Sequence, residues 1–161
     1  MMRGRAPSPL EPARSGGASV ANFDDLLSLP DPEWLVDGLV PAEGLSVFFG
    51  GPGSFKSFVV GSLALRGAAG VPWFGHATKP GFVVYVAAEG KAGLKGRVTA
   101  WWDAAGRPDI SRMRWLPEAV NLSDRAQVQR VRRSLASLPQ PPRVLVVDTM
   151  VARWSAATRM P

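Results

Sequence analysis

Short apolar runs alternate along this chain with longer stretches of helical periodicity. Four of the runs are typical of β-strands, and they cover residues 45–49, 82–87, 113–116 and 144–148. The helical patterns between them cover about residues 56–69, 92–105 and 124–138. Strands that alternate with helices indicate a parallel sheet, and near-continuous apolar runs indicate strands covered on both faces. The sequence therefore predicts an α/β fold.

The pattern at 124–138 is the clearest of the helices. Its apolar side chains fall on one stripe, formed by Val128, Val131, Leu135 and Leu138. We expect Ser123 to cap the start of this helix, with Leu122 placed as a hydrophobic staple.

The length of 161 residues allows one compact domain. Residues 1–21 are rich in Arg, Pro, Ser and Gly and are expected to be a disordered tail, with the domain formed by residues 22–161. Residues 23–29 are expected to form a short amphipathic turn, and residues 34–36 to belong to a leading segment outside the core.

Composition excludes several kinds of catalytic site. The chain has no Cys and a single His76, so thiolate metal sites, disulfides and a Ser-His-Asp triad are not expected. Basic residues number 19 against 13 acidic ones, and residues 97–161 carry 11 of the Arg against 5 acids, which permits a polyanionic partner. No segment has the pattern of a membrane span or a secretory signal, so we expect a cytoplasmic protein with no membrane partner.

The strongest chemical signal is the loop between the first strand and the first helix. Its residues are Gly50, Gly51, Pro52, Gly53, Ser54, Phe55, Lys56 and Ser57. A Gly-rich turn lets backbone N–H groups converge on a phosphate, and the following helix directs its positive end at the same anion. Lys56 would then reach the β and γ phosphates, and the Ser57 hydroxyl would bind Mg²⁺. An ordinary Gly-Pro turn with a solvated Lys56 is the structural alternative.

This phosphate-loop pattern has one departure, because it calls for Gly where the chain has Phe55. A Phe does not adopt positive φ cheaply. Either this position takes negative φ here, or the loop is strained.

Acidic side chains follow two of the predicted strands, at the strand ends that face the ligand crevice in open α/β sheets. Glu89 is placed to orient or deprotonate the water that attacks a γ-phosphate. Asp148 ends a Walker B pattern that holds Mg²⁺ through water. Thr149 follows Asp148, so no Glu adjoins it and Glu89 is the better candidate base. In the alternative, purely structural interpretation, Glu89 lies in the first turn of a helix and Asp148 begins a turn.

Together these motifs resemble the RecA-like P-loop ATPases, and within them the RepA-like hexameric replicative helicases of plasmids and phages. The resemblance covers about residues 22–153, and its motifs lie at residues 33–38, 54–58, 85–90, 93–97 and 147–149. It implies that Lys56 and Ser57 bind ATP and Mg²⁺, that Glu89 activates water, and that Asp148 supports the metal. It also implies a three-layer α/β/α core with a mostly parallel sheet, single-stranded DNA as a partner and a homo-hexameric ring.

The chain departs from that family after the Walker B strand. We expect the core to be incomplete at its C-terminus, without the strand that lies between the Walker B and P-loop strands, the sensor residue, the DNA-binding loops and the arginine finger. The expected function is an ATP-binding, ATP-hydrolysing motor domain of a helicase-like ATPase. A non-catalytic nucleotide-binding remnant and a RecA-like recombination or repair ATPase stay open.

A group of arginines in the predicted helix 124–138 is a weaker signal. It consists of Arg125, Arg130, Arg132 and Arg133. These side chains could meet DNA phosphates, although a charge run on the outer face of an amphipathic helix is commonly just solvated.

Overall fold

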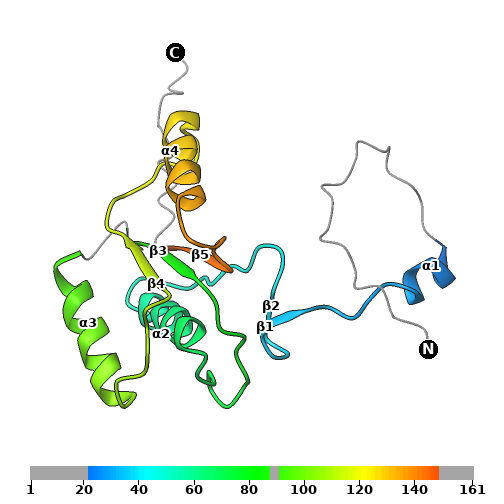
Figure 1. The fold of residues 1–161 in the computed structure, drawn as a ribbon, viewed down its shortest axis with the longest axis horizontal. Coiled ribbons are helices and arrows are strands. Elements are labelled where there is room, and N and C mark those ends of the chain that lie inside the picture. The colour runs from blue at the N-terminus through cyan, green and yellow to red at the C-terminus, as the bar shows by residue number, and fades with distance from the viewer. Residues whose placement is uncertain (1–21, 88–90, 149–161) are drawn as a thin grey trace. The chain divides into compact units, whose positions relative to one another are not determined.

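The computed structural model describes residues 22–87 and 91–148, and residues 83–148 of it contain a three-stranded parallel sheet (Figure 1). Its strands are β3 (Val83–Ala87), β4 (Met113–Leu116) and β5 (Val144–Asp148), in the order β4-β3-β5. Both neighbours run parallel to β3. The α/β fold with a parallel sheet, predicted from the alternating pattern, is confirmed.

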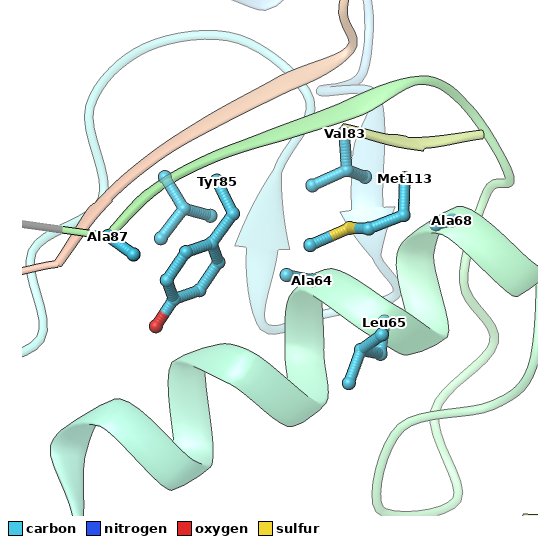
Figure 2. Packing of buried hydrophobic residues seen from close by; sticks show 8 residues of the cluster. Ala64, Leu65, Ala68, Val83, Tyr85, Ala87 and Met113 are labelled. Atoms are coloured by element: carbon cyan, nitrogen blue, oxygen red, sulfur yellow. The ribbon is translucent and has the colours of Figure 1, made fainter. Parts of the chain in front are cut away.

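The middle strand is buried on both of its faces. All five residues of β3 are buried. Val83, Tyr85 and Ala87 point toward α2 (Lys56–Ala69) and form one core cluster with its residues Ala64 and Leu65 (Figure 2). Residues that alternate with these along a strand face the other side of the sheet, which is why the run reads as continuously apolar.

Helices flank the sheet on both sides. Side chains of α3 (Lys91–Ala104), including Leu94 and Trp101, pack against the same cluster as α2. In the view of Figure 1, α4 (Arg125–Ala136) lies on the opposite side of the sheet from α2. Only Val131 of α4 is buried, so this helix keeps most of its surface in solvent.

The helix boundaries follow from local signals. α2 begins at Lys56 and ends before Gly70, which takes the left-handed conformation typical of a helix C-terminus and donates its N–H to the Arg66 carbonyl. The expected bounds of α2 are confirmed, and those of α3 differ from the prediction by one residue at each end.

The predicted cap of α4 is wrong by one residue. Asp124, not Ser123, is the N-cap, and its carboxylate accepts hydrogen bonds from the N–H groups of Ala126 and Gln127. A carboxylate and a hydroxyl are both good N-caps, so the local sequence alone did not decide between the two positions.

A small hairpin contributes a second core, contrary to expectation. β1 (Trp34–Val36) pairs antiparallel with β2 (Val40–Pro41). Leu35, Val36 and Val40 are buried in a cluster with Leu63 of α2 and Trp73. The segment 34–36, predicted to lie outside the core, is therefore inside it. Its burial depends on α2, which the short run itself does not reveal.

The run 45–49 does not form the predicted strand. Its residues have no regular structure, and Leu45, Val47 and Phe49 are exposed. A strand requires a neighbour that completes its hydrogen bonds, and neither sheet of the described residues includes this run. In the family that the motifs resemble, a further strand lies between the run 45–49 and the Walker B strand. Residues 22–87 and 91–148 contain no strand between these two segments.

The chain divides into two units, Met1–Asp31 and Pro32–Pro161. The described part of the first unit contains α1 (Phe23–Leu27), where the short turn was expected, and Asn22 caps it through the Asp25 N–H. The expected tail 1–21 lies outside the described residues, so that boundary stays a prediction. Across the described ranges, no helix combines the length and the apolar character needed to cross a membrane.

Candidate functional site

Residues from α2, β3 and β5 meet at the carboxyl end of the sheet. The Ser57 hydroxyl donates to Asp148 Oδ1 over 2.9 Å, although the two residues are 91 positions apart in the sequence. The Tyr85 hydroxyl donates to Asp148 Oδ2 over 2.6 Å. Both oxygens of one carboxylate are thus bound by side chains from other elements, and the parallel strand order is what brings them to one edge.

Tyr85 is a functional candidate that the sequence analysis did not single out. Burial, followed by the hydrogen bond to Asp148 and the charge of that carboxylate, raises the pKa of the Tyr85 phenol above its ordinary value, and Arg97 opposes this. The hydroxyl therefore stays protonated and acts as a donor. A tyrosine within an apolar strand was the available signal, because a buried phenol hydroxyl usually requires a hydrogen-bond partner.

The phosphate-loop residues close around the Lys56 side chain. Its ammonium donates to the carbonyls of Gly50 and Gly51 over 2.9 and 2.7 Å, and to Ser54 Oγ over 3.4 Å. A Cβ at Gly50 would lie 2.8 Å from Ser54 Oγ, so a larger residue there would displace the Ser54 hydroxyl. Pro52 and Gly53 complete the turn, with Gly53 at φ 75°.

The first turn of α2 leaves backbone donors at its N-terminus. The Phe55 carbonyl accepts from the N–H groups of Phe58 and Val59, and the N–H groups of Lys56 and Ser57 precede these first helical bonds. No side chain caps this end. Uncapped N–H groups and the helix dipole together favour an anion at this position.

Phe55 adopts the strained alternative of the two considered from the sequence. Its backbone lies in the left-handed region, with φ 59° and ψ 19°. The side chain is 70% exposed and its ring stands edge-on to that of Phe58, with centroids 5.8 Å apart. The strain is therefore not offset by burial of the ring.

The Ser57 and Asp148 pair fits a magnesium ion. Mg²⁺ prefers oxygen ligands and is commonly held by one or two protein groups, with water and substrate phosphates completing its shell. Because the Ser57 hydroxyl directs its hydrogen at Asp148, its oxygen lone pairs are left to face a cation. No group of three or more His, Cys, Asp or Glu suited to a metal occurs among the residues described, so the other ligands would come from phosphate and water.

The structure does not place Glu89, because residues 88–90 lie outside the described ranges. The strand before them is placed, and its last residue, Ala87, pairs with Asp148. The chain therefore leaves β3 beside the Walker B carboxylate, and the role of Glu89 stays a prediction.

The arginines predicted to meet DNA phosphates lie on α4. Arg125, Arg130, Arg132 and Arg133 are all exposed. Arg130 pairs with Glu118 over 3.3 Å. The face has the charge for a polyanion, and it also has the composition of a solvated surface.

An apolar cavity of about 80 Å³ adjoins the site between α2 and α3. Among its lining residues are Phe58, Leu65, Tyr85, Leu94 and Trp115. Tyr85 thus lines this cavity, and its hydroxyl is held by Asp148.

Comparison with known protein families identifies a match. The family model described as AAA domain matches residues 7–157 of the chain. No curated protein matches the sequence, and no solved structure matches the fold.

Proposed function

Because the chain belongs to the AAA domain family of P-loop ATPases, we propose that it binds and hydrolyses ATP with Mg²⁺, as the motor domain of a replicative-helicase-like, DNA-associated ATPase. The hydrogen bond between Ser57 and Asp148 carries the proposal. It joins the phosphate loop to the Walker B strand in the arrangement that a nucleotide-bound metal requires.

The loop binds the phosphates in this proposal. The N–H groups that open α2 and the Lys56 ammonium face the anion, and Lys56 exchanges its carbonyl partners for phosphate oxygens. The exchange is favourable because the ammonium then meets negatively charged oxygens in place of neutral carbonyls.

Ser57 and Asp148 would hold the metal, Asp148 through water, and the metal would neutralise charge that develops on the phosphate oxygens. Ser57 offers its hydroxyl oxygen, and Asp148 keeps that hydroxyl oriented. Glu89 orients the attacking water and accepts its proton.

The helicase-like part of the proposal rests on the motif resemblance and on the basic second half of the chain. The exposed arginines of α4 are candidates to contact the phosphates of single-stranded DNA. We expect single-stranded DNA to stimulate ATP hydrolysis, and we expect this stimulation to decrease as the salt concentration rises. Hydrolysis unaffected by DNA would remove this part and leave the nucleotide site.

The decisive experiment is a thermal shift with Mg²⁺-ATP on the wild type, Lys56→Ala and the control Lys79→Ala. Ligand that binds only the native state raises Tm. We expect the wild type and Lys79→Ala to shift, because Lys79 forms an exposed ion pair with Glu33 remote from the loop in sequence. Lys56→Ala is expected to show no shift. An equal shift in Lys56→Ala would disprove the phosphate-loop assignment.

Phosphate release, measured on the same samples, separates the alternative functions. Glu89→Gln is expected to keep the thermal shift of the wild type and to lose hydrolysis, since it removes the base and leaves the loop intact. A wild type that binds ATP without releasing phosphate would favour the non-catalytic alternative. Strand exchange between DNA molecules would favour the recombination alternative.

A further inference from the structure

Asp148 receives a second hydrogen bond that the phosphate-loop chemistry does not account for. Ser57 binds Oδ1, and Tyr85 binds Oδ2 over 2.6 Å. The carboxylate is therefore held at both oxygens, by a helix on one side and by the neighbouring strand on the other. A carboxylate bound in this way has lost the freedom to rotate about its terminal bond.

The tyrosine that makes this bond is itself fixed. Its side chain belongs to the core cluster, and the residue is 3% exposed. The ring packs against Trp115 of β4, with centroids 5.4 Å apart and an angle of 50° between the planes. In Figure 2 its hydroxyl points toward the N-terminal half of α2, away from the labelled core residues Val83 and Met113.

The strand register explains why the hydroxyl reaches Asp148. Ala87 is the direct partner of Asp148 across the ladder, and Tyr85 precedes it by two residues on the same face of β3. The phenol spans this two-residue step. A shorter hydroxyl side chain at position 85 would not bridge that distance.

We propose that Tyr85 is a positioning residue for the metal site, holding the Asp148 carboxylate so that Oδ1 stays directed at the Ser57 hydroxyl. This inference rests on the proposed function, because it assigns Tyr85 to the same Mg²⁺-nucleotide site. Residues that orient metal ligands from a second layer typically change metal affinity by about 10- to 100-fold when they are removed.

The test compares ATP affinity with saturating Mg²⁺ and with EDTA, in the wild type, Tyr85→Phe and Trp115→Phe. Tyr85→Phe removes the hydroxyl and keeps the buried ring. We expect it to weaken binding of Mg²⁺-ATP by about tenfold or more while leaving metal-free ATP affinity unchanged. Trp115→Phe alters the packing beside the ring and keeps the hydroxyl, so the ratio of the two affinities should stay that of the wild type.

The outcomes separate this inference from the function on which it rests. If the wild type binds Mg²⁺-ATP, Lys56→Ala does not, and Tyr85→Phe keeps the affinity ratio of the wild type, the positioning role is wrong and the nucleotide site stands. A Tyr85→Phe protein with a lower Tm and an unchanged ratio would make Tyr85 a structural residue only. If the wild type fails to bind Mg²⁺-ATP, the proposed function and this inference both fall.

Discussion

At the scale of single residues, Phe55 is the unusual member of the phosphate loop. It adopts φ 59°, a region that non-glycine residues enter at a cost of about 1–2 kcal/mol. Its ring contacts Phe58 but is mostly exposed, so packing of the ring offsets little of this strain energy. The turn is therefore imposed on Phe55 by the loop and by the start of α2 rather than favoured by the residue itself.

Phe55→Gly is expected to stabilise the protein. Removing the Cβ relieves about 1–2 kcal/mol of strain, and the extra backbone entropy of glycine in the unfolded chain offsets about 0.5–1 kcal/mol of this. The free energy of unfolding, measured by urea denaturation, should rise by about 0.5–1 kcal/mol. Phe55→Ala keeps the Cβ and serves as the control. If alanine stabilised as much as glycine, the cause would be loss of the exposed ring, not strain.

At the scale of elements, α4 depends on its cap. Few of its side chains are buried, so packing contributes little and the helix end matters more. The pKa of the Asp124 carboxyl is lowered mainly by hydrogen bonds from the Gln127 side chain and the Gln127 backbone N–H. The Ala126 N–H and the positive charge of Arg130 lower this pKa further. Because the folded state has the lower pKa, the cap contributes stability above the unfolded pKa and loses it as pH falls through the folded value.

Asp124→Ala is expected to lower Tm at neutral pH by about 2–4 °C, the usual effect of a lost N-cap in a chain of this size. Ser123→Ala, at the position that was expected to be the cap, should leave Tm unchanged. Both can be followed by circular dichroism. The difference in Tm between Asp124→Ala and the wild type should become smaller in acid. A difference in Tm that stayed constant down to pH 2 would show that the charge of the Asp124 carboxylate does not cause the stabilisation.

At the scale of the whole molecule, an apolar run and an open sheet edge are the prominent features of the described surface. Leu45 is 88% and Val47 is 67% exposed. β5 pairs with β3 on one side, and among the described strands none pairs with its other side. Exposed apolar residues and unpaired strand edges both favour self-association.

The double variant Leu45→Lys/Val47→Lys is expected to reduce self-association, because charge on an exposed apolar run opposes edge-to-edge pairing. Light scattering against concentration should show a smaller mean mass than for the wild type. Leu122→Lys changes another exposed leucine, outside the run, and should have no such effect. An unchanged mass in the double variant would mean that another surface drives association.

The sequence by itself determined the features whose signals are local. Hydrophobic periodicity and turn residues lie within a few positions of one another, so they predicted α2, β4, β5 and the α/β class, and they singled out Lys56, Ser57 and Asp148. Only the tertiary structure decided what depends on distant partners. It left the run 45–49 without a strand neighbour, buried Leu35 and Val36 against α2, and brought Tyr85 to Asp148. The physical reason is that the backbone groups of a strand and a side-chain hydroxyl find their hydrogen-bond partners at distant positions of the sequence. Ser57 and Asp148 are 91 residues apart, and no local sequence pattern indicates that they are in contact.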